Sequence, residues 1–232
     1  MIHFEVDAEA LQRDVPYQVD LWNDRAFVSL VAFALRGMRP RWGGRLGALL
    51  FQPIASHEFL NVRTYVRHDE EAGIHFLAEW LPNRLAVLTG RPVFGLPYRY
   101  GGITRSPIRC GDPFRGRVVD SASGVKLEYR GQLAAPPAFL PCAAGSLDEW
   151  LMERYTAFNS AGARKRFFRV WHPPWSQCRA QVNADERSLL TTNWPWFEQA
   201  RFAAANYSPG LAEVWMGRPH WAAPNRPLPI KG

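Results

Sequence analysis

Ten consecutive residues, Ala26 to Leu35, carry no charge. An apolar run of this length is typical of a strand that is buried on both faces, or of a long strand in a barrel wall. The run is too short to cross a bilayer as a helix, and Ser29 interrupts it. The segment therefore predicts a β-rich globular core rather than a membrane span.

Two further pairs of segments predict β-hairpins. Residues 61–66 alternate in period two, and residues 74–81 return after a polar turn. Residues 116–119 and 126–133 flank a second turn that contains Ser and Gly. Because hairpins join antiparallel strands, we expect most of the chain to form an antiparallel meander.

Helices are predicted at two positions, each with a capping residue. Asp7 can cap a short helix that closes before Pro16. Ser146 can cap a second helix while Glu149 reaches back to its first turn, which is a capping-box arrangement. The apolar face predicted for this second helix, which should pack on the sheet, consists of Leu147, Trp150, Leu151, Tyr155 and Phe158.

Length and composition bound the domain organisation. The chain has 232 residues, of which 47% are hydrophobic and 13% are aromatic, and this excludes a disordered chain. We expect a single domain over residues 1–232 that ends in an extended, proline-rich tail over residues 217–232.

The net charge of +7 raises nucleic-acid binding as a function class. The basic residues are scattered instead of clustered, so nucleic acid is not the expected partner.

The cysteines, the histidines and the N-terminal stretch indicate whether the protein holds a metal or a cofactor and in which compartment it works. Cys110, Cys142 and Cys178 are widely separated, which argues against a disulfide framework and a zinc knuckle. No two histidines have the close spacing that metal ligands favour, and no glycine-rich loop fits a phosphate, so we expect no metal and no cofactor. The N-terminal stretch is acidic and lacks a signal-peptide pattern, which predicts a cytoplasmic protein without membrane association.

An ordered set of short segments resembles the YqjF-like family of conserved bacterial proteins of unknown function. The set spans nearly the whole chain, and its order makes the resemblance specific. The segments are Asn61–Val66, Pro82–Val87, Phe94–Tyr100, Glu153–Tyr155, His172–Trp175 and Tyr207–Gly210.

The family is similar to acetoacetate decarboxylase, and this resemblance implies the fold. It implies an α+β domain with a closed, cone-like antiparallel β-barrel, peripheral helices and a ligand pocket inside. In the decarboxylase a lysine that follows a proline forms a Schiff base with the keto acid, and its neighbour is also a lysine. Aligned on Pro97, that pattern places Tyr98 at the nucleophile and Arg99 at its neighbour, while Arg63 matches a glutamate of the family.

These departures change the chemistry that the resemblance implies. Neither Tyr98 nor Arg99 can form a Schiff base, so decarboxylation through an imine is not expected. If Arg63 and Arg99 both face the barrel interior, the pocket is positively charged and suits a small carboxylate. The candidates for proton transfer or ligand orientation are Glu79, Tyr98, Tyr100 and His172.

Other readings of the same residues stay open. Arg63 and Arg99 could pair with Glu58 or Glu79 as structural ion pairs, or point into solvent. The expected function is binding of a small organic anion, and the residues do not decide whether the protein is an enzyme. The alternative is a non-catalytic sensor or a protein-interaction module that uses the ten Trp residues, and a homo-oligomer is compatible with either.

Overall fold

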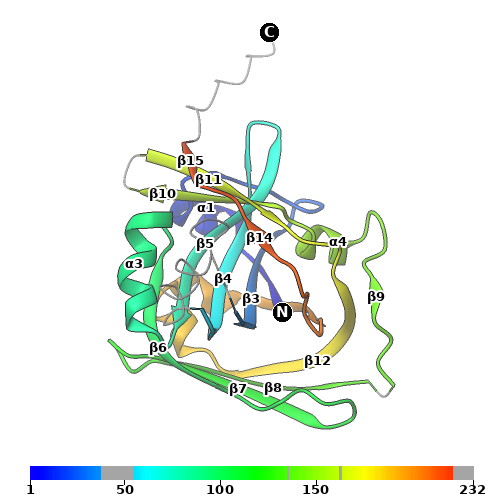
Figure 1. Ribbon diagram of the computed structural model, residues 1–232. Helices are drawn as coiled ribbons and strands as arrows, with labels where there is room; N and C mark the ends of the chain where they lie inside the picture. The colour runs from blue at the N-terminus through cyan, green and yellow to red at the C-terminus, as the bar shows by residue number, and fades with distance from the viewer. Residues whose placement is uncertain (38–54, 135, 162–163, 222–232) are drawn as a thin grey trace.

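The computed structural model describes residues 1–37, 55–134, 136–161 and 164–221 (Figure 1). The helices in this part of the chain are α1 (Ala8–Asp14), α3 (Arg84–Phe94), α4 (Leu147–Met152), α5 (Ser188–Thr191) and the 3-10 helix η2 (Pro195–Gln199). The strands are β1 (Ile2–Val6), β2 (Gln18–Val19), β3 (Ala26–Leu35), β4 (His57–His68), β5 (Glu71–Leu81), β6 (Tyr98–Arg105), β7 (Pro113–Asp120), β8 (Lys126–Leu133), β9 (Leu140–Pro141), β10 (Thr156–Ala161), β11 (Arg164–Trp171), β12 (Ser176–Glu186), β13 (Arg201–Tyr207), β14 (Trp215–Met216) and β15 (His220–Trp221).

Nine strands close into a barrel with few helices around it. The hydrogen-bonded order round the wall is β5, β6, β7, β8, β12, β13, β1, β3 and β4, and β4 pairs again with β5. This confirms the predicted α+β barrel with peripheral helices. The wall is mixed, however, because β5 and β6 run parallel, and β10 also joins β5 in parallel. Parallel neighbours need a crossover, and α3 provides it between β5 and β6.

The predicted strands and hairpins are present. The uncharged run forms β3, which pairs with β1 on one side and β4 on the other. The first hairpin is β4–β5 and the second is β7–β8, both antiparallel. Each hairpin is longer than its sequence pattern, because residues beyond the pattern, both apolar and charged, also enter the ladder.

Both predicted helices are present, with the predicted caps. Asp7 accepts from the amide of Ala10 at 2.7 Å, and Ser146 accepts from the amide of Glu149 at 3.2 Å. The second helix, α4, nevertheless ends at Met152, so the predicted apolar face is only its first half. Residues beyond it, including Phe158, turn into β10, because pairing with β5 and β11 overrides the helical periodicity.

The barrel wall has two faces, because successive residues of a strand point to opposite sides. We call them the Trp80 face and the Glu79 face. On β4 and β5, the Trp80 face carries Val62 and Trp80, which belong to the largest apolar cluster. The Glu79 face carries Tyr65 and Phe76, which belong to a second cluster that α4 covers. An extra residue in β5 shifts the register between these positions.

Two further expectations concern membrane association and the C-terminal tail. None of the helices in the described ranges combines the length and the apolar character that a membrane crossing requires. The predicted tail begins with a paired segment, because β15 pairs with β11. Residues 222–232, the remainder of that tail, lie outside the described residues.

Candidate functional site

Arg63 lies in β4 on the Glu79 face and is only 9% exposed. Its Nη2 donates to the carbonyl of Leu151 at 3.0 Å. Among the described residues, its Nε has no hydrogen-bond partner and no carboxylate lies within ion-pair distance. The alternative of an ion pair with Glu58 is not observed, since Glu58 pairs with Arg105 at 2.6 Å. The structure thus holds a buried guanidinium without a counter-ion in its described part.

Glu79 lies on the same face, in β5, and is 3% exposed. In the ladder it stands beside Asn61 of β4 and Tyr98 of β6. Its Oε1 has no hydrogen-bond partner within the described ranges. Burial raises the pKa of this carboxyl to about 8, so the group is mostly protonated at neutral pH. A protonated carboxyl can donate a hydrogen bond, which a carboxylate cannot.

The two neighbours of Glu79 complete a polar row across three strands. Asn61 is 8% exposed, and its Oδ1 has no partner in the described part of the chain. Burial and the nearby Glu79 both raise the pKa of Tyr98, so its hydroxyl stays protonated. Asn61, Glu79 and Tyr98 therefore present an acceptor, an acid and a phenol at adjacent positions of the wall.

A chain of hydrogen bonds continues from Arg63 towards β1. His3 Nδ1 lies 2.6 Å from the hydroxyl of Ser29, and this hydroxyl lies 2.5 Å from that of Tyr65. Tyr65 also donates to the carbonyl of Leu151, the group that Arg63 contacts, at 2.8 Å. Burial lowers the pKa of His3 well below its ordinary value, so the imidazole is neutral. These contacts fix the ring of Tyr65 beside the guanidinium.

The structure does not bring Arg99 together with Arg63. Arg99 pairs with Trp80 in the ladder, stacks over its ring at 5.1 Å and donates to the side chain of Asn193. It therefore lies on the Trp80 face, whereas Arg63 lies on the Glu79 face. Since the two faces are opposite sides of one wall, at most one of these arginines can line the barrel interior.

The two remaining candidates lie away from this polar row. Tyr100 follows Tyr98 on the same face but is 36% exposed and sits under the guanidinium of Arg84 at 4.7 Å. His172 is buried after β11, stacks on Tyr155 at 4.7 Å and contacts Trp175. Neither makes a contact with Glu79 in the part of the chain that is described.

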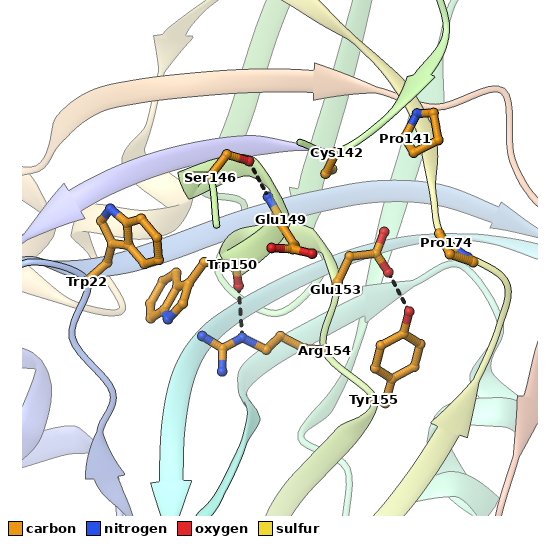
Figure 2. Close-up of a pocket in the computed structure, with 10 residues that line it drawn as sticks. All are labelled: Trp22, Pro141, Cys142, Ser146, Glu149, Trp150, Glu153, Arg154, Tyr155 and Pro174. Carbon is orange, nitrogen blue, oxygen red and sulfur yellow. Dashed lines mark hydrogen bonds between the residues drawn. The ribbon is translucent and has the colours of Figure 1, made fainter. Parts of the chain in front are cut away.

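The structure also has a groove beside α4 (Figure 2). The sequence did not predict this groove. Its volume is about 550 Å³. Three aromatic side chains, two prolines and two glutamates are among its ten lining residues. The lining residues are Trp22, Pro141, Cys142, Ser146, Glu149, Trp150, Glu153, Arg154, Tyr155 and Pro174. In the sequence this region was marked by the capping box and by the Glu153–Tyr155 and His172–Trp175 segments, but not as a groove.

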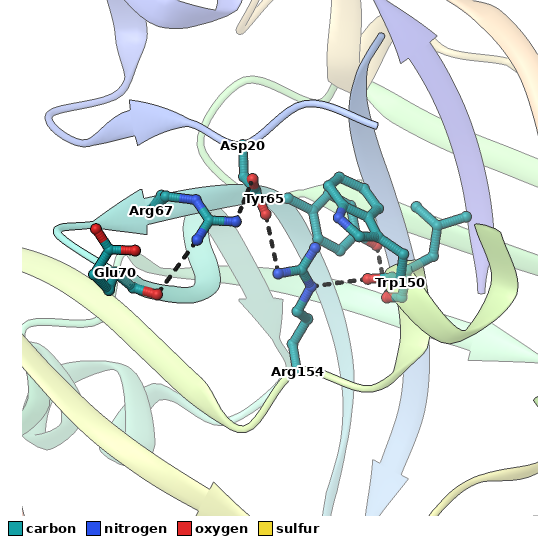
Figure 3. A network of polar contacts seen from close by, with 7 residues as sticks. Asp20, Tyr65, Arg67, Glu70, Trp150 and Arg154 are labelled. Carbon is teal, nitrogen blue, oxygen red and sulfur yellow. Dashed lines mark hydrogen bonds and ion pairs between the residues drawn. The ribbon is translucent and has the colours of Figure 1, made fainter. Parts of the chain in front are cut away.

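Arg154, at the inner wall of the groove, belongs to a polar network (Figure 3). Its Nη1 pairs with Asp20 at 3.0 Å, and its Nε donates to the carbonyl of Trp150 at 2.8 Å. Arg67 binds the other oxygen of Asp20 at 3.2 Å. The side chain of Arg154 is 7% exposed. Sequence reasoning missed Arg154 because its partner Asp20 is far away in the chain.

Within the described ranges, no three His, Cys, Asp or Glu side chains converge as metal ligands would. The polar groups described on the Glu79 face are instead the cation Arg63, the protonated acid Glu79, the amide Asn61 and the phenols of Tyr65 and Tyr98. These groups donate and accept hydrogen bonds, and they suit an organic anion better than a metal ion.

Solved structures with this fold support the architecture at low sequence identity. An acetoacetate decarboxylase-like enzyme from Sphingomonas wittichii RW1 matches with a TM-score of 0.60 and 14% identity, covering 94% of this chain and 85% of that one. The enduracididine biosynthesis enzyme MppR, complexed with pyruvate, matches with a TM-score of 0.55 and 14% identity, covering 94% and 81%. These matches show the fold alone.

Sequence comparison assigns the family. The uncharacterised protein YqjF of Bacillus subtilis strain 168 is 31% identical over 182 residues, which cover 75% of this chain and 69% of the relative. A family model described as an uncharacterised conserved protein, DUF2071, matches residues 1–212. The acetoacetate decarboxylase-like barrel described above therefore belongs to a member of the DUF2071 family.

Proposed function

We propose that this protein binds a small organic anion, most simply a carboxylate, on the Glu79 face, with Arg63 as the cation that holds it. The observation that carries the proposal is the buried guanidinium of Arg63, which has a free Nε and no carboxylate partner among the described residues. A buried charge without a counter-ion is costly, and a carboxylate ligand would relieve that cost.

Glu79 fits this function because burial raises its pKa to about 8. At neutral pH the group carries mostly no charge, so it does not repel an anion and can donate a hydrogen bond to it. Asn61 and Tyr98 flank it in the ladder and would orient the rest of the ligand. Glu79 is also the candidate for proton transfer, should the protein be catalytic.

The proposal excludes a lysine Schiff base at this site. Tyr98 occupies the ladder position beside Glu79 and offers a phenol instead of an amine. The lysines in the described part of the chain have other contacts: Lys126 pairs with Glu128 at 3.3 Å, and Lys165 lies over the ring of Tyr17. What remains is recognition of an anion, with acid–base chemistry at most.

The test measures thermal stabilisation of the full chain by pyruvate and by acetate. We expect the wild type to be stabilised and Arg63→Gln to lose at least about 90% of the affinity, because a charged hydrogen-bond partner is removed. Arg99→Gln is the matched control, since Arg99 lies on the opposite face, and it should keep the wild-type shift. Equal shifts in wild type and Arg63→Gln would overturn the proposal.

A second candidate function, protein interaction, rests on exposed apolar side chains at one edge of the sheet. Trp171 is 57% exposed, Trp221 is 55% exposed and Met216 is 40% exposed, on β11, β15 and β14. Light scattering over a range of protein concentrations tests the simplest form, a homo-oligomer. A wild-type dimer that Trp171→Ser converts to a monomer would support it, and a monomer at all concentrations would exclude it.

A further inference from the structure

We infer that Arg154 is a second cationic residue of the anion site and that the ligand class is a dicarboxylate. This inference rests on the proposed function, because it concerns the same site, and it replaces Arg99 by a residue that the structure places near Arg63. It adds a ligand charge and a specificity-determining residue that the sequence alone did not indicate.

The first argument is geometric. The guanidinium groups of Arg63 and Arg154 lie 6.0 Å and 5.5 Å from the centre of the Tyr65 ring. Both are anchored to consecutive carbonyls of α4, since Arg63 donates to Leu151 and Arg154 donates to Trp150. Two like charges are thus held in one neighbourhood by the same short helix.

The second argument is the balance of charge around these groups. Asp20 is the carboxylate that Arg154 contacts, and Arg67 shares it. In the described part of the chain, three guanidinium groups (Arg63, Arg67 and Arg154) therefore have one carboxylate between them. Burial and the positive charge of Arg63 lower the pKa of Arg154, which places the two cations within electrostatic reach. Within this contact network the surplus is two positive charges, and a ligand with two carboxylates would neutralise it.

The third argument is access. Arg154 and Trp150 line the groove, so a ligand in the groove would lie against the side chain of Arg154, which is 7% exposed (Figure 2). The Nη2 of Arg154 is buried and has no hydrogen-bond partner among the described residues. The acids of the groove are engaged elsewhere: Glu149 accepts from the amide of Gly145, and Glu153 accepts from Trp175 and Tyr155. An acceptor for Nη2 must therefore come from another group, and a second carboxylate supplies it.

The test compares succinate with propionate, which has a similar chain and one carboxylate fewer, by calorimetric titration of the full chain. We expect the wild type to bind succinate at least about tenfold more tightly. Arg154→Gln should bring the two affinities to within about threefold of each other, while Arg63→Gln should weaken both ligands. Arg169→Gln is the control, because Arg169 is an exposed arginine whose pair with Glu71 lies apart from this network.

Each outcome separates this inference from the proposed function. If Arg154→Gln retains the wild-type preference for succinate, the inference fails while anion binding stands. If the wild type binds neither compound, the proposed function fails and the inference falls with it. Should Arg154→Gln not fold, Arg67→Gln carries the test: Arg67 is 40% exposed, and losing its charge should lower the succinate preference without changing propionate binding. An unchanged preference in Arg67→Gln would then count against the inference.

Discussion

At the scale of single residues, the Glu79 face is defined by groups whose ordinary behaviour burial has changed. Glu79 loses most of its charge, and Arg63 is buried without a carboxylate partner in the described ranges. Each condition costs free energy in the unliganded protein. Such costs persist mainly at sites that bind something, and this is the reason for placing the function here.

The first prediction concerns the pH dependence of stability. The pKa of Glu79 is about 8 in the folded chain and near its ordinary value of 4.5 in the unfolded chain. The folded state therefore holds the extra proton between these pH values. The stabilisation is fully present below about pH 4.5 and is lost as pH rises through about 8, at up to about 1.4 kcal/mol per pH unit.

Glu79→Gln should abolish this loss. The free energy of unfolding of the variant minus that of the wild type should therefore increase between pH 5 and pH 8.5. Urea denaturation of both proteins at several pH values measures the difference. Glu70→Gln, at an exposed position, is the control and should follow the wild-type profile. Parallel profiles for wild type and Glu79→Gln would show that the carboxyl titrates normally.

Residue identity at the site could be predicted from the sequence more easily than residue orientation. The sequence singled out Arg63, Glu79 and Tyr98, and the structure places all three on one face. Arg99 was predicted with them but lies opposite, because a step of one residue along a strand reverses the face. The direction of β6 and its register with β5 decide which residue faces the site, and neither has a local signal.

At the scale of elements, α4 links the barrel wall to the groove. Its last carbonyls accept from Arg63, Tyr65 and Arg154, so its position sets that of the two cations. The helix has only six residues, which is too short to be stable alone. Its capping residue, Ser146, should therefore affect both stability and binding.

Ser146→Ala should lower the free energy of unfolding by about 1 kcal/mol, because the cap bond to Glu149 N is lost. It should also weaken stabilisation by carboxylates. Ser146→Asp is the matched variant: an aspartate caps equally well, so both properties should stay near wild type. Chemical denaturation with and without pyruvate measures them. Equal destabilisation by both variants would mean that the hydroxyl acts by packing and not as a cap.

The branch of the sheet at β5 gives another prediction. There β10 pairs with the first half of β5 and β6 with the second half. A Cβ on Gly73 would lie 2.5 Å from the backbone carbonyl of Thr156, which cannot move aside easily. Gly73→Ala should therefore cost about 1 to 3 kcal/mol of stability. Gly102→Ala, where a Cβ would meet nothing within 4 Å, should cost clearly less in the same thermal denaturation; equal losses would contradict the crowding argument.

The elements that could be predicted are those with local signals. The hairpins β4–β5 and β7–β8 join neighbours through short turns, and the caps Asp7 and Ser146 act within one helical turn. The parallel pairs β5–β6 and β5–β10 escaped prediction because their partners are not joined by a turn. Phe158 was assigned to the helix for a similar reason, because its pairing with His75 of β5 joins residues that are far apart in the sequence.

At the scale of the whole molecule, the fold is shared with acetoacetate decarboxylase-like enzymes while the side chains that would carry the chemistry differ. The barrel is like that of the acetoacetate decarboxylase-like enzyme from Sphingomonas wittichii, yet identity is only 14%. A shared fold transfers a shape and a place for a site, but the reaction depends on the side chains at that place. Here the decisive position is Tyr98, which lies beside the buried acid Glu79.

A trapping experiment tests whether this one side chain separates the two chemistries. Incubation with pyruvate and cyanoborohydride should leave the wild type without an adduct on the peptide that contains Tyr98, because a phenol cannot form an imine. Tyr98→Lys places an amine at this position, where burial favours its neutral, nucleophilic form. Mass spectrometry with peptide mapping should then find a reduced pyruvate adduct on the peptide that contains position 98. An adduct in the wild type at Lys126 or Lys165 that excess succinate prevents would mean that imine chemistry takes place in this barrel after all.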